Sequence, residues 1–293
     1  MPIGPIFALL ASLLFAGNLV TVTRGIHLGG KTGPASAITV FTGVLVYLLL
    51  LPITGAYRQL ASASWQAITL LAVAGALNFS LSRYLFFSSI RIIGANRSIS
   101  ISRSDILFAA FFGIVFFQET ITLPLVLGSL AIMLGATIVN LVTEEGTYKF
   151  QLSGAILAVT ASLCGATSSL LVKSAMKEVT SPLAATFVSY TAAAVVWLVI
   201  IIARRDQRVS LLTLNRRVLA LFIITGVLLL TGHLLSYAAL AISPVSVIQP
   251  LLGTVVLFTF LLSFLVNRRT EVFSWRMFTG ILMVLAGIIL VFV

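Results

Sequence analysis

Charged and polar side chains that could do chemistry are few in this sequence, and those inside apolar runs stand out. Arg83, Arg103 and Asp105 lie within runs that are otherwise apolar, and His233 is the only histidine inside such a run. Gln249 precedes a proline in another run. A charge at the centre of a membrane helix costs about 2.5–3.5 kcal/mol on insertion scales, so each charged group must face protein or water.

Asp105 is the one acidic residue of seven that lies deep in an apolar run, because the other six lie in or next to loops. Its run begins near Gly94, which places Asp105 about eleven residues into a helix, roughly 16 Å along it at the usual rise. Two hypotheses stay open. In one, Asp105 forms a structural ion pair with Arg83 or Arg103. In the other, Asp105 titrates as a proton-coupling group while Arg103 holds the carboxylate or phosphate of a solute.

Other polar positions in the apolar runs have a structural and a functional interpretation. His233 is either a hydrogen-bonded interior residue or a solute contact. Gln249-Pro250 should kink its helix and leave a free carbonyl beside an amide side chain. Asn18 and Asn78 join helices by hydrogen bonds or donate into a cavity. The candidate substrate-binding residues are Arg83, Arg103, Asp105, His233, Gln249 and Asn18, with Asp105 as the proton-coupling candidate.

The composition determines the setting of these residues. Of 293 residues, 60% are hydrophobic and 9% are charged, against about 25% charged in soluble domains. A soluble enzyme is thereby excluded. Ten apolar runs, each about as long as a membrane span, lie at roughly 3–23, 34–53, 65–88, 94–117, 122–142, 152–172, 182–203, 217–240, 244–266 and 274–293. The sequence therefore predicts an all-α integral membrane protein with ten transmembrane helices, multi-pass in the cell (plasma or inner) membrane.

The two halves of the sequence repeat one another. The recurring pairs are Arg24 and Lys173, 149 positions apart, and Glu119, Gly128 and Gly135 with Glu271, Gly280 and Gly287, 152 positions apart. Each half, 3–142 and 152–293, holds five predicted helices, and an odd number makes the second half enter the membrane from the opposite side. Such inverted repeats are typical of secondary transporters, whose solute site lies near the midplane between the halves.

The sequence also resembles a known family. Phe15-Ala16-Gly17-Asn18 is similar to that family's Trp-Gly-Ser-Asn, and Ile93-Gly94-Ala95 to its Leu-Gly-Ala. The stretch Asp105–Val139 resembles its Glu-Pro-Leu-Phe-Ala-Ala pattern, which ends in Gly-Glu before a glycine-punctuated helix. The family is the EamA-type carriers of the drug/metabolite transporter superfamily, and the resemblance covers nearly the whole chain as two five-helix repeats. This sequence departs from the family pattern at the Glu-Pro pair, which is Asp105-Ile106 in the first half and Gln249-Pro250 in the second. The resemblance implies alternating-access transport of small organic molecules, often export of amino acids, metabolites or drugs.

An intramembrane enzyme and a solute channel are the alternatives. An enzyme needs a nucleophile with a base, or metal ligands, and the sequence has two histidines, no Gly-x-Ser-x-Gly and no His-Glu-x-x-His. No catalytic residue, cofactor or metal site is predicted, and the chain is expected not to be an enzyme. A channel needs oligomeric symmetry and a filter loop. The expected partners are a small-molecule solute and membrane lipid, not nucleic acid, and the chain is expected to be a monomer or a loose homodimer.

Charge makes two further predictions. Two arginines against one aspartate within the spans favour solutes that carry a carboxylate or phosphate, including zwitterionic amino acids, over cationic drugs. Thirteen basic residues flank one set of span ends and three flank the other. The positive-inside rule places the richer side in the cytoplasm and both termini outside, whereas the resemblance implies termini inside.

Overall fold

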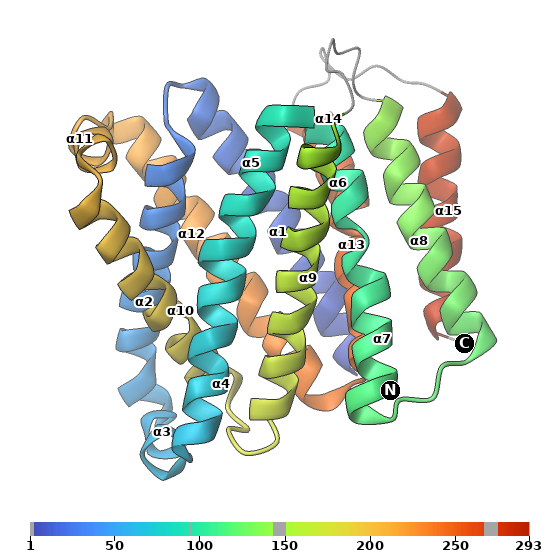
Figure 1. The fold of residues 1–293 in the computed structure, drawn as a ribbon, viewed down its shortest axis with the longest axis horizontal. Coiled ribbons are helices and arrows are strands. Elements are labelled where there is room, and N and C mark those ends of the chain that lie inside the picture. Colours follow the sequence, from blue (N-terminus) through green and yellow to red (C-terminus); the bar gives the residue numbers. More distant parts are fainter. Residues whose placement is uncertain (1–2, 94, 143–150, 267–274, 293) are drawn as a thin grey trace.

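The computed structural model describes residues 3–93, 95–142, 151–266 and 275–292, and within these ranges all regular structure is helical. The helices run side by side across the molecule (Figure 1). The first half of the chain forms α1 (Ile3–His27), α2 (Thr32–Thr54), α3 (Tyr57–Ser62), α4 (Trp65–Ala76), the π-helix η1 (Leu77–Ser82), α5 (Arg83–Ile93), α6 (Ala95–Ser102), α7 (Asp105–Phe117) and α8 (Leu123–Val142). The second half forms α9 (Leu152–Ala175), α10 (Pro182–Ala203), α11 (Arg205–Leu212), α12 (Arg216–Ile242), α13 (Val245–Gly253), α14 (Val255–Val266) and α15 (Trp275–Phe292).

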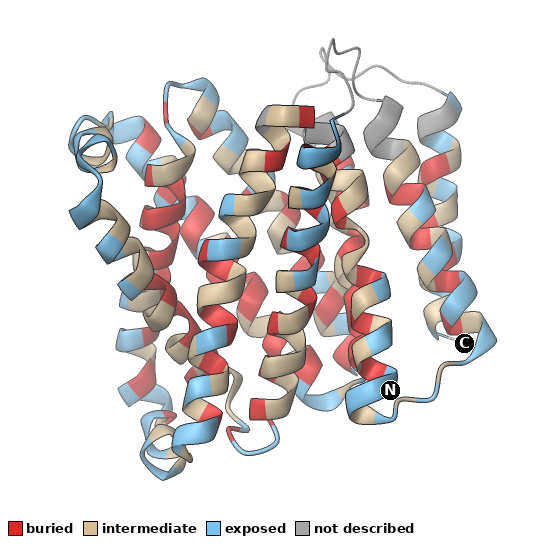
Figure 2. Cartoon of the chain, in the orientation of Figure 1, coloured by how far each residue is buried: buried red, intermediate tan, exposed pale blue. Residues whose placement is uncertain are grey.

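Eight helical stretches of the described chain are long and apolar enough to cross a membrane, and the apolar stretches Leu123–Ile138 and Phe278–Val291 are shorter. Large apolar side chains lie exposed along the outer faces, for example Leu45, Leu49 and Ile53 on α2. Figure 2 shows these exposed outer faces surrounding a buried interior. The chain is therefore a multi-pass membrane protein. Each of the ten predicted runs forms helix, while the count of ten membrane crossings stays a prediction.

Two of the predicted runs are broken rather than continuous, the fourth at Arg103 and Ser104 and the ninth at Thr254. The third is helical throughout but contains the π-helix η1 between α4 and α5. The expectation of a continuous helix through Asp105 was wrong, because Asp105 is the first residue of α7. Pro250 lies inside α13, which continues past it to Gly253, and the kink expected there stays a prediction. The 149-residue offset between the repeats maps Ser104 onto Gly253, one residue before Thr254, so the two breaks lie at closely corresponding places.

Glycines at matching places in the two halves pack α8 against α15. A Cβ added to Gly128 would lie 2.8 Å from the Gly287 carbonyl oxygen, and one added to Gly135 would lie 2.6 Å from that of Gly280. Any side chain at these positions would push the helices apart. Close backbone approach of this kind drives helix association in lipid, where the hydrophobic effect does not.

Helix α9 occupies the middle of the molecule. It packs against α4, η1, α5 and α7 of the first half. Ser82 Oγ donates to the Ala161 carbonyl and Ser168 Oγ donates to the Ala74 carbonyl, both at 2.9 Å. Helix α1 begins at the end of the molecule where both termini lie, whereas α9 begins at the opposite end (Figure 1). These hydrogen bonds fix the third span beside α9 and so position one wall of the cavity described next.

Candidate functional site

A cavity of about 280 Å³ lies between the two halves of the chain. Its walls come from α5, the break between α6 and α7, and helices α9, α12 and α13. Five of the six predicted site residues line it, namely Arg83, Arg103, Asp105, His233 and Gln249. Asn78 and six serines add further hydrogen-bonding groups to the lining. The structure thus collects the polar groups of the apolar runs around one space.

Asp105 connects the two halves of the chain at this cavity. Gln249 Nε2 donates to Asp105 Oδ2 at 3.1 Å, and Ser169 Oγ donates to Gln249 Oε1 at 3.3 Å. The other carboxylate oxygen, Oδ1, is buried and has no hydrogen-bond partner. Asp105 also lies in the first turn of α7, where the helix dipole favours negative charge. The carboxylate is therefore held in place by one oxygen, while the other is buried without a partner.

Arg103 lies in the break between α6 and α7, next to Asp105. Its Nε is buried without a hydrogen-bond partner. Within the described ranges, the one ion pair joins Lys173 to Glu119, so the structural pair predicted between Asp105 and Arg83 or Arg103 is not formed here. A guanidinium with an unpartnered N–H group at a cavity is suited to a carboxylate or phosphate, which it can bind through two parallel hydrogen bonds.

His233 and Asn18 differ in their relation to the cavity. His233 lines it, and its Nδ1 lies 2.9 Å from the Tyr190 hydroxyl. The rings of Phe15 and Phe79 pack on the imidazole at centroid distances of 4.8 and 4.5 Å. Asn18 is instead buried between α1 and α12, where its Nδ2 donates to the Thr225 carbonyl at 3.1 Å. Asn18 joins two helices and does not line the cavity.

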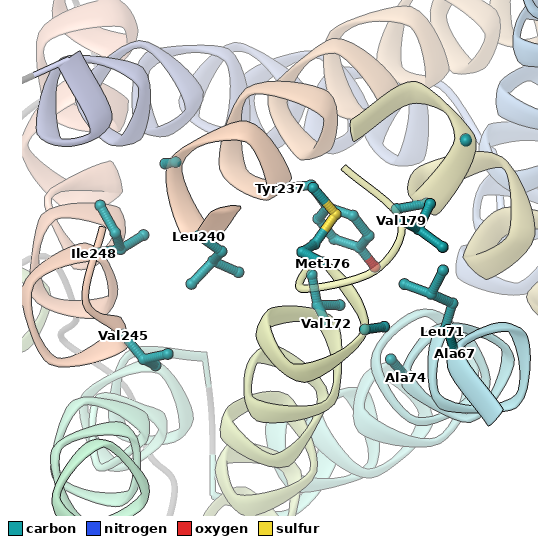
Figure 3. Packing of buried hydrophobic residues seen from close by; sticks show 14 of the residues in the cluster. Ala67, Leu71, Ala74, Val172, Met176, Val179, Tyr237, Leu240, Val245 and Ile248 are labelled. Atoms are coloured by element: carbon teal, nitrogen blue, oxygen red, sulfur yellow. The ribbon is translucent and has the colours of Figure 1, made fainter. Parts of the chain in front are cut away.

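Apolar packing closes the cavity on the side of the chain termini. Val172, Tyr237 and Leu240 line the cavity and belong to a cluster of buried residues. Met176 and Val179, which follow α9, pack with Tyr237 and Val172 in Figure 3. We call this packed layer, between the cavity and the end of the molecule, the floor.

Glu119 ties the two halves together beyond the floor. Its Oε1 accepts a hydrogen bond from the Val245 N–H at 2.8 Å, and its Oε2 accepts from the Ser246 N–H at 3.0 Å and the Ser246 hydroxyl at 2.5 Å. Lys173 Nζ lies 3.4 Å from Oε1. Partial burial disfavours the carboxylate, but the Ser246 and Val245 hydrogen bonds and the Lys173 charge outweigh it and lower the pKa of Glu119. Gly113 leaves room for this carboxylate, since a Cβ there would lie 2.4 Å from Oε2.

Glu178 makes the reciprocal connection at the same end. Its carboxylate accepts hydrogen bonds from the backbone N–H of Ser64 and, at 2.7 Å, from the Ser64 hydroxyl. These two bonds lower the pKa of Glu178. Ser64 is the N-cap of α4. Glu119 of the first half thus binds the N-terminus of a second-half helix, and Glu178 of the second half binds the N-terminus of a first-half helix. We call the two connections together the latch.

Comparison with known proteins gives the family. The model of the EamA-like transporter family matches residues 2–141 and again residues 152–293. The chain belongs to the EamA-like transporter family. A solved structure titled only "Crystal structure of protein" superposes with a TM-score of 0.76 at 14% sequence identity, over 98% of this chain and 94% of its own. No curated protein matches the chain.

This EamA-like chain has functional candidates that sequence reasoning missed. Glu119 and Lys173 served only as markers of the repeat, and Glu178 was not singled out. The signal that could have found them is a charge at the end of a span facing the start of a span from the other half. Among the cavity residues, Ser169 and Tyr237 were missed because serine and tyrosine are ordinary in membrane helices.

The EamA-like chain also contains a pattern that resembles a nucleotide-binding loop. Residues 25–32 read Gly-Ile-His-Leu-Gly-Gly-Lys-Thr, which matches the Gly-x-x-x-x-Gly-Lys-Thr spacing. The structure places them between α1 and α2, not after a strand. The Gly30 N–H donates to the Gly25 carbonyl and the Gly29 N–H to the Ile26 carbonyl. The amides of Gly29 and Gly30 are therefore already used within the loop, and no strand precedes it, so the structure gives no support for a nucleotide site here.

Proposed function

We propose that this protein is a secondary carrier for a small organic solute that bears a carboxylate or phosphate. The observation that carries the proposal is the pair of unpartnered buried atoms at the cavity, Arg103 Nε and Asp105 Oδ1. A buried polar group without a partner costs about 1–3 kcal/mol, and more when it is charged. A solute with an anionic oxygen for Arg103 and a donor for Asp105 would recover that energy. Zwitterionic amino acids and other small metabolites meet this description.

The architecture supports alternating access between the two sides of the membrane. Helices α1 and α9 start at opposite ends of the molecule (Figure 1), as an inverted repeat requires. The α6–α7 and α13–α14 breaks fall at closely corresponding positions beside the cavity, and discontinuous helices form the sites of many inverted-repeat carriers. In this proposal, the floor and the latch open while the other end closes, so that the cavity faces one side at a time.

Protons are the proposed coupling ion, and Asp105 is the proposed site of their binding. Its free oxygen can take up a proton, while Gln249 keeps the side chain in place through the other oxygen. We further propose that the protein acts as an exporter in the cell membrane, which is the role that membership of the family favours. Anionic lipid headgroups would meet the basic span ends.

Counterflow in proteoliposomes tests the carrier and its solute class together. Vesicles are loaded with one unlabelled compound from a panel of carboxylates, organic phosphates, zwitterionic amino acids and cationic amines, and uptake of its labelled form is followed. We expect saturable countertransport for anionic or zwitterionic compounds. Flux that never saturates or never exchanges would indicate a channel, and countertransport confined to the amines would overturn the assigned solute class.

The Asp105→Asn variant tests the coupling. It keeps the size of the side chain and the acceptor for Gln249, but it cannot ionise. Counterflow should persist in this variant at higher solute concentrations, because the lost carboxylate oxygen also weakens solute binding, whereas accumulation against a gradient driven by a pH difference should be lost. If Asp105→Asn accumulates solute as the unchanged protein does, Asp105 is not the coupling residue.

A further inference from the structure

A second space, which we call the groove, lies between helices of the first half and α10 and α11 of the second half. Its volume is about 570 Å³, twice that of the cavity. It lies between α2, η1, α5 and α10, with Arg204 and Gln207 at the end where α10 meets α11. The groove exists because the third span packs on α9 along its whole length but leaves α10 after η1. Helix α4 packs closely on α10, where a Cβ on Gly75 would meet the Ser189 backbone, whereas α5 packs on α9 and not closely on α10.

The groove and the cavity share one residue of the described chain, Arg83. Around it, neighbouring residues of the third span alternate between the two spaces. Asn78, Ser82 and Phe86 line the cavity, and their neighbours Leu77, Leu81 and Phe87 line the groove. The two spaces therefore lie along adjoining faces of the third span, and the long Arg83 side chain stands at the border between those faces.

The chemistry of the two spaces is complementary. The cavity holds Arg103, Asp105 and His233, whereas the groove is lined mainly by apolar side chains. Its apolar lining includes Val73, Leu77, Leu81, Phe87, Val196, Trp197 and Ile200. A ligand in both spaces would place a polar head in the cavity and an apolar chain in the groove. Its anionic oxygen would lie within the reach of the one cation that both spaces share.

We infer that the solute is an amphiphilic anion, with its anionic head held by Arg83 and Arg103 in the cavity and an apolar tail in the groove. This inference rests on the proposed function and specifies its solute class. Its physical argument is that an apolar groove adjoining the cavity stabilises a tail in proportion to the apolar area that it covers. An arginine at the junction of the spaces favours an anion over a cation of the same shape. The competing occupant is a membrane phospholipid, whose acyl chain would fill the groove and whose headgroup would meet Arg204.

Two neighbouring valines on α10 provide a matched test. Val196 lines the groove, whereas Val195 is 56% exposed on the outer surface and does not line it. Val196→Phe fills the groove, and Val195→Phe adds the same bulk outside it. If Val196→Phe does not fold, Ala76→Leu is a milder filling of the same groove. Binding of acetate, hexanoate and hexylamine is measured on purified protein in nanodiscs.

A buried methylene raises affinity roughly fourfold, so we expect hexanoate to bind at least about tenfold more tightly than acetate. The ratio of the two affinities should fall towards one in Val196→Phe or Ala76→Leu and should not change in Val195→Phe. Hexylamine should not bind at the site. If acetate and hexanoate bind equally, or if the ratio of their affinities is unchanged in both filled variants, the tail does not occupy the groove and the inference is wrong. The groove would then be a lipid site, and the proposed anion carrier would be unaffected. If neither carboxylate nor any other anion binds, the proposed function itself has failed.

Discussion

The two ends of helix α7 each present a carboxylate, and the two groups have opposite surroundings. Asp105 begins the helix at the cavity, where one oxygen accepts a single hydrogen bond from Gln249 and the other has none. Glu119 follows the end of the helix beyond the floor, where three hydrogen bonds and Lys173 satisfy both oxygens. The same chemical group is thus completely bound at one end and half bound at the other.

This difference distinguishes a structural carboxylate from one that is available to a ligand or a proton. Buried polar groups in folded proteins are nearly always hydrogen-bonded, and exceptions often mark functional positions. Glu119 obeys the rule and holds α13 against the first half. Asp105 and its neighbour Arg103 depart from the rule on the surface of a cavity. We therefore expect changes at the cavity to alter binding and transport, and changes at the latch to alter stability and opening.

The largest effect on binding is expected for Arg103→Gln. Hydrogen bonds to charged groups contribute about 1.5–3 kcal/mol each, so the loss of the guanidinium should weaken binding of carboxylates by about 10–100-fold. Equilibrium binding of a transported carboxylate is the measurement. Arg58→Gln, at an exposed arginine beyond the spans, is the control and should bind as before. Equal, small effects in both variants would assign Arg103 to structure alone.

Glu119→Gln should act on the closed end and not on binding chemistry. Replacing the carboxylate weakens charge-assisted hydrogen bonds worth about 1.5–3 kcal/mol each. The melting temperature should fall by several degrees, and a cysteine placed at Val172 in a Cys164→Ser background should become more reactive towards a water-soluble reagent. The exposed carboxylate of Asp206 supplies the control, since Asp206→Asn should change neither. If the latch has no role in closing this end, the cysteine at position 172 should react with the reagent no faster in Glu119→Gln than without that change.

The latch should also depend on pH with a defined sign. The pKa of Glu119 lies below its usual 4.5 in this structure, so the carboxylate stabilises the fold fully above the ordinary pKa. That contribution is lost as the pH falls through the lowered pKa. The pKa of Glu178 is lowered too, and both contributions fade in acid. Melting curves against pH should therefore flatten in part in Glu119→Gln and further when Glu178→Gln is added.

The smallest effects are expected for changes at Asn18 and Asn78, which lie in different surroundings. Asn18 donates to the Thr225 carbonyl between helices, whereas Asn78 lines the cavity. Asn18→Ala should cost about 1 kcal/mol of stability and leave the transport KM unchanged. Asn78→Ala should raise KM with little change in the melting temperature. The reverse pattern, measured by melting and by initial transport rates, would contradict the division between cavity and scaffold.

Much of the fold follows from the sequence, because apolar runs and their spacing are local properties. The ten helical runs and the paired EamA repeats could be predicted, and five of the six candidate residues, all except Asn18, line one cavity. The break at Arg103 and Ser104 could not, since neither glycine nor proline marks it. Pro250 does not mark the break in its own run, because α13 continues past it and the break follows Gly253. The groove could not be predicted either, since it arises where α5, unlike α4, does not pack closely on α10.

The most direct test of the account compares the two carboxylates of α7 in one measurement. Protein is reconstituted in vesicles that contain a pH-sensitive dye, and a transported carboxylate or amino acid is added outside. The unchanged protein and Glu119→Gln should both move protons in response to the solute, whereas Asp105→Asn should move none while still exchanging solute. Solute-driven proton movement that survives in Asp105→Asn and disappears in Glu119→Gln would contradict the account.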